Sequence, residues 1–395
     1  MKKLRVGVYL NAVPHSGGAF QYNLSILEAV SGLSEDLYSK VACFSNPQWM
    51  EVIKKYNVEC KYAGNFNLGN LAYKVVRKLV PITEFQRAIS PLLFPVARTV
   101  MKENCDIWIF PTEDELSYQI PVPALTTIYD LMHRYEPRFP EVSGKRIYHE
   151  REMRYQNICR YCKGILVDSE IGKNQVIETY GIKTEKVFSL PFIAPDYIYS
   201  SVTNEDFDRR HQLPKKFLFY PAQFWEHKNH KNLLKAIAKL TKDLPDLKIV
   251  FVGSKKNVYG SIKRLTMELD LLKQVVFLGY VSNSDLAALY RRARALIMPT
   301  YFGPTNIPPL EAFVSGCPAA VSKIYGMPEQ VGDAALLFNP DSIDEISKCI
   351  EMLWKDDDLC AKLISSGREK GKKWGPSQFR ERLKEIIEKV CTATT

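Results

Sequence analysis

The stretch "ALIMPTYFGPTNIPPLEAFVSGCPAAVS", Ala295–Ser322, contains two apolar runs separated by a stiff turn and a short helical segment. The runs "ALIMPT" and "PAAVS" are typical of buried strands. Between them, Pro308 and Pro309 fit the first turn of a helix, where a missing N–H costs nothing. Gly316 and Pro318 then end that helix. The stretch therefore predicts a strand, a helix and a second strand in immediate succession.

The same alternation of apolar runs and helical patterns extends along the whole chain. Continuous apolar strands with helices between them are typical of parallel sheets that are covered on both faces. Two series of such strands predict an α/β fold with two doubly wound, Rossmann-like domains, which agrees with a length of 395 residues. The expected strands are "LRVGVYL", "KVACFS", "DIWIFP", "ALTTIYD" and "GILVDS", followed by "KFLFYPA", "LKIVFVG", "VVFLGYV", "ALIMPT" and "PAAVS".

The polar segment Leu190–Lys216, which is punctuated by prolines, predicts the linker between the two domains. We therefore expect an N-terminal domain over residues 1–195 and a C-terminal domain over residues 196–375. Ligands of such sheets lie beyond the carboxyl ends of the strands, so a site in a cleft between the domains is expected. Apolar residues at helical spacing predict a final amphipathic helix within residues 376–395.

Composition and motifs exclude several classes of protein. Hydrophobic residues make up 46% of the chain and charged residues 25%, which are values of soluble enzymes. No apolar run approaches the ~18–20 residues of a membrane span, and the apolar run after the basic N-terminus is too short for a secretory signal. No G-x-G-x-x-G motif follows an expected strand, which disfavours a dehydrogenase. Because Cys159 and Cys162 form a lone C-x-x-C pair among nine scattered cysteines, reduced, packed thiols in the cytoplasm are favoured over a zinc site.

The net charge of +10 is concentrated in part in one segment. Leu71–Lys102 carries six basic residues and one acidic residue, and its portion "LAYKVVRKLV" has the pattern of an amphipathic helix. One interpretation is a solvated helix face. The other is docking on an anionic membrane surface, to which each basic residue contributes on the order of 1 kcal/mol. Nucleic acid is disfavoured because no reader motif is present.

Glu311 lies in the first turn of the helix in the opening stretch. The free amides at a helix start attract anions such as phosphate. A capping box is excluded because Pro308, and not Ser or Thr, lies three residues before Glu311. The Glu311 carboxylate either interacts favourably with the helix dipole or accepts two hydrogen bonds from a vicinal diol such as a ribose. A diphosphate at the helix start and a ribose at Glu311 would be two halves of one ligand.

The segment "FGPTNIPPLEAFVSGCPAAVSKIYGMPEQVGDAALLFNPDS" resembles the donor-binding region of group 1 (family 4) glycosyltransferases. "SGGAFQYNL", "TTIYDL", "GILVDSE" and "YPAQFWEHKNHKNLLKAI" are similar to further pieces of that family, in the same order. The resemblance implies the GT-B fold, a nucleotide diphosphate-sugar donor and transfer with retention of configuration. It also implies that the final helix crosses back to the first domain, that no metal is needed, and that lipid-linked or surface glycans are extended.

The chain departs from the family pattern at three places. Thr300 stands where the family has a glutamate that contacts the donor sugar, and the loop from there to Glu311 is longer. Gln223 replaces an arginine of the diphosphate clamp, while Lys228 keeps the position of its lysine. Tyr129 and Asp130 replace a His-Asp pair, with His133 close behind. We expect Thr305, Asn306 and the loop amides to supply sugar contacts, and His227, His230 or Lys231 to compensate for Gln223.

The predicted site combines residues from both domains, and most of them keep a structural alternative. Lys228 would neutralise the leaving diphosphate. The two glycines after the first strand either let a ligand approach the backbone or only form a turn. A packed histidine and a helix cap are the alternatives for His133 and Asp130. The predicted catalytic residues are Lys228 and Glu311, the donor-binding residues are Gly17, Gly18, Gln223, Lys228, Gly303, Thr305, Asn306, Ile307 and Glu311, and the substrate-binding residues are His133 and Asp130.

Two hypotheses about function follow. The first is a cytoplasmic glycosyltransferase of cell-surface polysaccharide biosynthesis, peripheral at the membrane, whose basic N-terminal half docks the acceptor. The second is a degenerate module that binds a nucleotide-sugar without turnover, which Thr300 and Gln223 motivate. An epimerase or a phosphorylase on the same scaffold is a weaker enzyme alternative.

Overall fold

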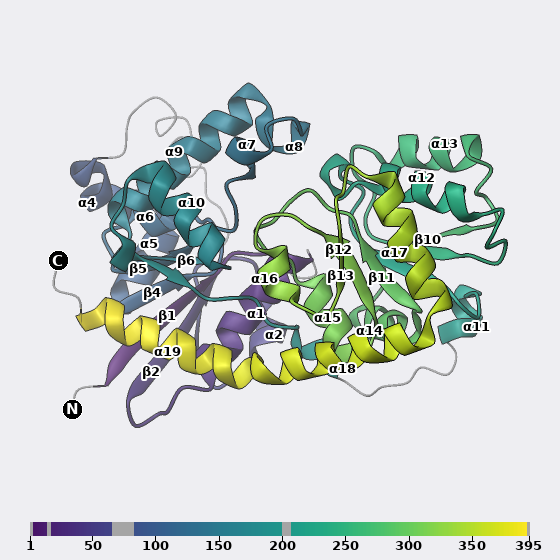
Figure 1. Ribbon diagram of the computed structural model, residues 1–395. Helices are drawn as coiled ribbons and strands as arrows, with labels where there is room; N and C mark the ends of the chain where they lie inside the picture. Colours follow the sequence, from purple (N-terminus) through teal and green to yellow (C-terminus); the bar gives the residue numbers. More distant parts are fainter. Residues whose placement is uncertain (1–2, 14–16, 65–82, 200–206, 393–395) are drawn as a thin grey trace. The chain divides into compact units, whose positions relative to one another are not determined.

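The computed structural model describes residues 3–13, 17–64, 83–199 and 207–392 (Figure 1). The chain divides into two compact units. The N-terminal unit comprises Met1–Leu131, Tyr148–Pro191 and Pro376–Thr395, and the C-terminal unit comprises Met132–Ile147 and Phe192–Gly375. The amphipathic pattern expected at residues 71–80 and part of the expected linker lie outside the described residues.

The N-terminal unit is built on a parallel sheet with the strand order β3-β2-β1-β4-β5-β6-β7. The order reverses between β1 and β4, which is the mark of a doubly wound sheet. Its strands are β1 (Leu4–Leu10), β2 (Tyr38–Phe44), β3 (Glu59–Tyr62), β4 (Ile107–Phe110), β5 (Ala124–Thr127), β6 (Gly164–Val167) and β7 (Val187–Ser189). Its helices are α1 (Gly18–Ser31), α2 (Trp49–Ile53), α4 (Glu84–Leu93), α5 (Pro95–Lys102), α6 (Leu116–Gln119), α9 (Lys145–Tyr161, whose first turn belongs to the other unit), α10 (Glu170–Tyr180), η1 (Thr184–Lys186) and α19 (Pro376–Thr392).

The C-terminal unit repeats this plan with the strand order β10-β9-β8-β11-β12-β13, and its reversal lies between β8 and β11. Its strands are β8 (Leu218–Pro221), β9 (Ile249–Val252), β10 (Val275–Gly279), β11 (Ala295–Met298), β12 (Ala319–Ser322) and β13 (Leu336–Phe338). Its helices are α7 (Met132–Tyr135), α8 (Pro140–Ser143), η2 (Asp196–Tyr199), α11 (Phe207–His211), η3 (Glu226–Lys228), α12 (His230–Leu240), α13 (Tyr259–Glu268), α14 (Asn283–Arg292), α15 (Pro308–Ser315), α16 (Met327–Val331), α17 (Ile343–Lys355) and α18 (Asp357–Lys373).

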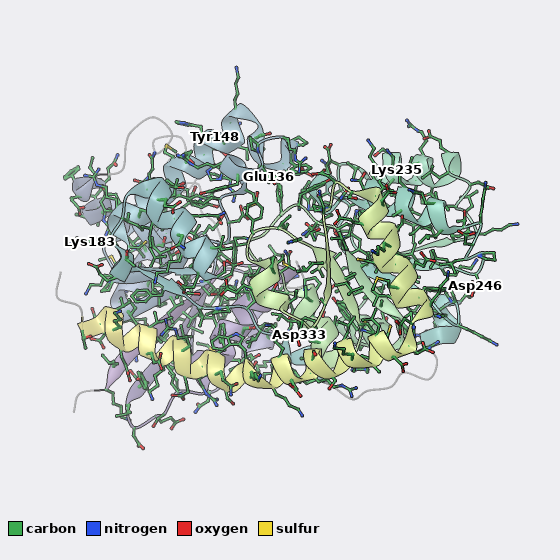
Figure 2. All side chains as sticks on the ribbon, in the orientation of Figure 1. Glu136, Tyr148, Lys183, Lys235, Asp246 and Asp333 are labelled. Atoms are coloured by element: carbon green, nitrogen blue, oxygen red, sulfur yellow. The ribbon has the colours of Figure 1, made fainter. Side chains whose placement is uncertain are left out.

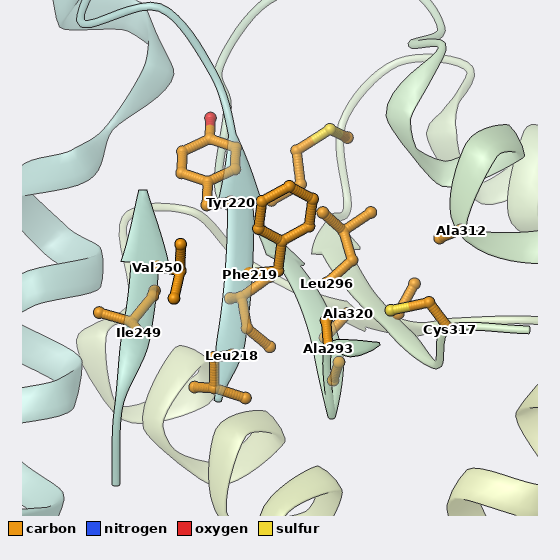
Figure 3. Packing of buried hydrophobic residues seen from close by; sticks show 14 of the residues in the cluster. Leu218, Phe219, Tyr220, Ile249, Val250, Ala293, Leu296, Ala312, Cys317 and Ala320 are labelled. Carbon is orange, nitrogen blue, oxygen red and sulfur yellow. The ribbon is translucent and has the colours of Figure 1, made fainter. Parts of the chain in front are cut away.

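The core of the C-terminal unit lies on both faces of its sheet. In Figure 3, Leu218 and Phe219 of β8 lie beside Ile249 and Val250 of β9, their partners in the parallel ladder. All four are fully buried, as expected for strands with apolar side chains on both faces. Right-handed crossovers place the helices before and after the strand reversal on opposite faces of the sheet. Loops that follow β8 and β11 therefore emerge side by side at the carboxyl edge.

The opening stretch folds as predicted. β11 pairs in parallel with β12, and α15 lies between them in the sequence. Gly316 ends α15 in the left-handed conformation, with a φ of 71°, where a side chain would be strained. Three short strands were not predicted, namely β3, β7 and β13. β3 is an edge strand that carries mostly exposed side chains, so it lacks the apolar run that marks the others.

Two segments belong to the unit that does not surround them in the sequence, namely the final helix and residues 132–147. α19 packs on α1 of the N-terminal unit, where the rings of Phe379 and Tyr22 meet edge to face at 6.4 Å. By contrast, residues 132–147, expected in the N-terminal domain, belong to the C-terminal unit. The reason is a small apolar cluster in which Met132, Phe139 and Val142 pack against Tyr301 and Phe302.

Neither a membrane span nor a metal cluster is found within the described ranges. There, no helix combines the length and the apolar character that crossing a membrane requires. The same residues contain no group of three or more His, Cys, Asp or Glu side chains that could bind a metal ion. Cys159 and Cys162 are buried free thiols, and burial raises their pKa to about 12 and about 11. Both thiols are packed, as expected, while their redox state and the absence of a zinc ion stay predictions.

Candidate functional site

The turn after β11 is fixed by its own polar groups. Thr300 is fully buried, and its Oγ1 accepts from the Phe302 amide at 3.2 Å and donates to the His227 carbonyl at 3.4 Å. The Tyr301 amide donates to the same carbonyl at 2.8 Å. The Thr300 hydroxyl thus holds the backbone of the turn through two hydrogen bonds. Because the residue is fully buried, it presents no surface to a ligand in this conformation.

The loop that leads to α15 is held by Gln330 of α16. The Asn306 amide donates to Gln330 Oε1 at 3.1 Å, and Gln330 Nε2 donates to the Asn306 carbonyl at 2.8 Å. The Asn306 side chain donates to the Phe302 carbonyl at 3.0 Å. Gly303 has a φ of +94°, and a Cβ there would lie 2.6 Å from the Thr305 carbonyl oxygen. Hydrogen bonds thus hold the loop at both sides of Asn306, and the Asn306 side-chain amide is used within the loop.

Glu311 lies in the first turn of α15, as predicted, but the residue is only 5% exposed. Its Oε1 accepts a hydrogen bond from Tyr197 of η2, and its Oε2 accepts one from Tyr290 of α14 at 2.6 Å. Burial raises the pKa of Glu311, and the hydroxyls of Tyr197 and Tyr290 oppose the rise. Each oxygen keeps a second lone pair. The ribose contact stays a prediction, and the two tyrosines are partners that no sequence pattern indicated.

Lys228 lies in η3, on the loop after β8. Its carbonyl accepts from the Tyr220 hydroxyl at 2.8 Å, and its amide donates to the Trp225 carbonyl at 3.1 Å. Next to it, the Asn229 side chain donates to the Pro299 carbonyl at 3.0 Å, which joins this loop to the end of β11. Lys228 and the turn after β11 are thus brought together at the strand reversal of this sheet.

Gln223 and the residues expected to compensate for it differ in their surroundings. Gln223 Oε1 accepts from Trp225 Nε1 at 2.8 Å. His230 is 1% exposed and stacks on Phe224 at 4.4 Å, and burial lowers its pKa to about 3, so it does not supply a cation. His227 stacks on Phe302 at 3.9 Å, and its Nδ1 lies 3.5 Å from a carboxylate oxygen of Glu141.

The predicted site residues of the first half are the donor-binding Gly17 and Gly18 and the substrate-binding Asp130 and His133. Gly17 is the N-cap of α1 with a φ of 89°, a conformation that favours glycine, and Gly18 begins the helix. Asp130 forms an ion pair with Arg151 at 2.6 Å. His133 is fully buried in α7, which favours the alternative of a packed histidine. Of the remaining donor-binding residues, Thr305 is buried and Ile307 immediately precedes α15.

A pair of carboxylates at the end of β4 was missed by the sequence analysis. Glu113 Oε1 accepts from the Tyr155 hydroxyl at 2.6 Å, and burial raises the pKa of Glu113 although Arg151 opposes the rise. Asp114 accepts from the Asn11 side chain, and burial raises its pKa to about 6. Both residues lie just after the predicted strand "DIWIFP", separated from it by Thr112, and next to the strand reversal of the N-terminal unit. Their position after an expected strand was the feature of the sequence that could have indicated them.

Comparison with known proteins shows which family the C-terminal half of the chain resembles. The sequence profile described as "Glycosyl transferases group 1" matches residues 201–370. The O-antigen chain mannosyltransferase RfbU of Salmonella typhimurium is 29% identical over 215 residues, which are 54% of this chain and 56% of RfbU. O-antigen chain mannosyltransferase B of Escherichia coli is 28% identical over 203 residues, 49% of this chain and 52% of that protein. The chain thus spans about half the length of these curated relatives.

Solved structures agree on the fold. HepE of Anabaena, whose crystal structure is in complex with UDP and glucose, superposes with a TM-score of 0.73 over 98% of this chain and 99% of HepE. The two sequences are 14% identical, so this likeness concerns the fold alone. Residues 201–370 are therefore similar to the group 1 glycosyl transferases, and the fold of the chain is the GT-B fold.

Proposed function

We propose that the protein is a glycosyltransferase that moves a hexose from a nucleotide diphosphate-sugar to a hydroxyl of a glycan or lipid-linked acceptor. The observation that supports this most is the meeting of the Lys228 loop and the turn before α15 at the reversal between β8 and β11. Doubly wound sheets bind ligands at this point. The similarity of residues 201–370 to the group 1 glycosyl transferases supports the same activity.

In this proposal the donor lies along the carboxyl edge of the C-terminal sheet. The amides at the start of α15 and the Lys228 ammonium take the diphosphate, and the Glu311 carboxylate takes the ribose. Because a lysine and helix amides neutralise the diphosphate, no metal ion is required. The names of the relatives make mannose the first sugar to test, and the UDP in the HepE structure makes uridine one of the first bases.

The chemistry we propose is transfer with retention of configuration. The acceptor hydroxyl attacks the anomeric carbon from the side of the leaving group, the bond between that carbon and the diphosphate oxygen breaks, and the diphosphate receives the hydroxyl proton. Lys228 stabilises the charge that develops on the leaving oxygen. This route needs no side-chain base, which suits a site whose carboxylate Glu311 is already bonded to two tyrosines.

We propose that the acceptor docks on the N-terminal unit. The product would be a cell-surface polysaccharide, because the two relatives are named as O-antigen chain mannosyltransferases. We place the protein in the cytoplasm, at an anionic membrane surface. Phe85 and Leu92 of α4 support the membrane contact, because they are 72% and 79% exposed and lie two helical turns apart. Arg98 and Lys102 of α5 are exposed as well.

A second candidate function is a module that binds a nucleotide-sugar without turnover. It is favoured by the burial of Thr300, which stands where the family has a sugar-contacting glutamate, and by the absence of a charge at Gln223. Such a module would bind nucleoside diphosphates but would neither transfer nor hydrolyse the sugar.

The first test is a thermal-shift panel of UDP-, GDP-, ADP- and dTDP-sugars with their nucleoside diphosphates. Binding at a hundredfold excess over the dissociation constant stabilises by about 2.7 kcal/mol, which is easily seen. One base should raise the melting temperature of the wild type, and Glu311→Gln should abolish that rise while it remains folded. An unchanged affinity in Glu311→Gln would refute the ribose contact, and no shift with any ligand would refute the proposed donor site.

A further inference from the structure

The segment Met132–Ile147 follows β5 of the N-terminal unit in the sequence, yet it packs in the C-terminal unit. Phe139 is its apolar anchor, because its ring lies 5.2 Å from the rings of both Tyr301 and Phe302. Two carboxylates of the segment also contact residues of the main part of that unit, Phe192–Gly375. Glu136, labelled in Figure 2, accepts from the Tyr325 hydroxyl at 2.9 Å. The other is Glu141, at the first turn of α8.

Three groups converge on one oxygen of Glu141. Its Oε1 accepts from the Glu226 amide at 2.5 Å and from Asn257 Nδ2 at 3.2 Å, and it lies 3.5 Å from His227 Nδ1. The Glu141 side chain is 8% exposed. Burial alone would raise its pKa, but His227 and then the amides of Glu141 itself and of Glu226 lower it to about 2. The group is therefore a fixed carboxylate at neutral pH.

The Glu226 amide is the first donor of η3, the three-residue turn that carries Lys228. The N-cap residue of this turn, Trp225, provides no side-chain capping hydrogen bond to the amides of the turn. A single turn of this length does not stabilise itself, because fixing its backbone costs more than one hydrogen bond returns. Glu141 supplies the missing cap from a segment 85 residues away in the sequence.

A carboxylate beside a phosphate site has an electrostatic cost. It repels the ligand unless nearby donors compensate its charge, and here an amide, a carboxamide and an imidazole do so. A carboxylate whose charge is compensated in this way gains nothing from the ligand, so its presence is explained by its contact with the turn. We propose that Glu141 is a positioning residue, which holds the 226–228 turn so that the Lys228 ammonium reaches the terminal phosphate of the donor. This inference rests on the proposed function.

The test compares nucleotides with one and two phosphates. Wild type, Glu141→Ala and Glu141→Gln are titrated in the full chain with UDP, UMP, GDP and GMP by calorimetry. For the base that binds, Glu141→Ala should raise the dissociation constant of the diphosphate about tenfold, equal to about 1.4 kcal/mol, and that of the monophosphate less than about twofold. Glu141→Gln keeps an acceptor oxygen and should cost about threefold.

A double-mutant cycle separates positioning from a general structural role. In a Lys228→Met background, Glu141→Ala should add nothing to the loss of diphosphate affinity, because the side chain that it positions is gone. Glu136→Gln is the matched control: it lies on the same segment but contacts Tyr325, so the ratio of the two affinities should not change. Equal losses for monophosphate and diphosphate, or full additivity with Lys228→Met, would overturn the inference.

Hydrogen exchange gives a readout that needs no ligand. The peptide that covers residues 224–231 should exchange faster in Glu141→Ala than in Glu136→Gln, because η3 has lost the acceptor of its first amide. Equal exchange would overturn the inference whatever the nucleotides do. If the wild type binds none of the four nucleotides while exchange changes as expected, the donor site fails and the contact to the turn stands.

Discussion

Tyr290→Phe tests the buried contact that α14 makes with Glu311. The substitution keeps the shape of a fully buried ring and removes the hydroxyl that donates to Glu311 Oε2 at 2.6 Å. A hydrogen bond to a charged group contributes roughly 1.5–3 kcal/mol, and one between neutral groups about 1 kcal/mol. We expect Tyr290→Phe to lose about 2 kcal/mol at pH 7.5, which for a unit of this size is roughly 4–8 °C in melting temperature.

The pKa of Glu311 determines how the stability lost in Tyr290→Phe changes with pH. Burial raises the pKa of Glu311, and the hydroxyls of Tyr197 and Tyr290 lower it, so the loss of one hydroxyl raises it further. The folded state then binds a proton more tightly than the unfolded chain. Stability consequently falls as the pH rises from the unfolded pKa through the folded pKa. Tyr290→Phe should therefore lose more stability at pH 7.5 than at pH 5, where Glu311 is closer to neutral.

The assay is urea denaturation followed by circular dichroism at both pH values. Tyr280→Phe is the control, because Tyr280 is 62% exposed and its substitution should cost nothing measurable at either pH. If Tyr290→Phe destabilises the protein equally at pH 5 and pH 7.5, Glu311 does not titrate in the expected sense. If it does not destabilise the protein at all, the contact with Tyr290 is not made in solution.

Three further predictions concern the donor loop, the membrane surface and the thiols. Gln330→Ala should raise the Michaelis constant for the donor more than it lowers the turnover number, because it frees the loop before α15; an unchanged constant would contradict this. Phe85→Ser combined with Leu92→Ser should reduce sedimentation with phosphatidylglycerol vesicles, and unchanged sedimentation would contradict the membrane contact. Iodoacetamide should label exposed Cys60 before buried Cys159 in the folded protein, as mass spectrometry would show; the reverse order would contradict the described burial.

Much of the fold could be predicted because its strands are buried on both faces. "ALIMPT" and "PAAVS" are continuous apolar runs, and they became β11 and β12. β3 carries mostly exposed side chains at a sheet edge, and no apolar run marks it. The segment at residues 132–147 was assigned to the wrong unit because sequence order places it after β5, whereas its contacts are made with Tyr301 and Phe302.

The site could be predicted only where its residues follow strands. Lys228 was predicted from the resemblance to the family, and the loop that carries it meets the turn before α15, as expected for loops at the carboxyl ends of neighbouring parallel strands. The partners of these residues were not found, since Tyr197 and Glu311 are 114 positions apart and Glu141 and Glu226 are 85 apart. Contacts between distant segments leave no periodic pattern in one sequence. For the same reason the burial of Thr300 could not be foreseen, whereas the burial of His133 agrees with the alternative of a packed histidine.

The central claim is that the C-terminal unit activates a nucleotide diphosphate-sugar for transfer. The most direct measurement is the release of nucleoside diphosphate from the donor that binds, with a lipid-linked glycan acceptor, by the wild type and by Lys228→Met. The account predicts steady release by the wild type and a rate on the order of a hundredfold lower for Lys228→Met, because the developing charge on the leaving oxygen loses its cation. Firm donor binding without any release would contradict the account and favour a module that binds the donor and does not turn it over.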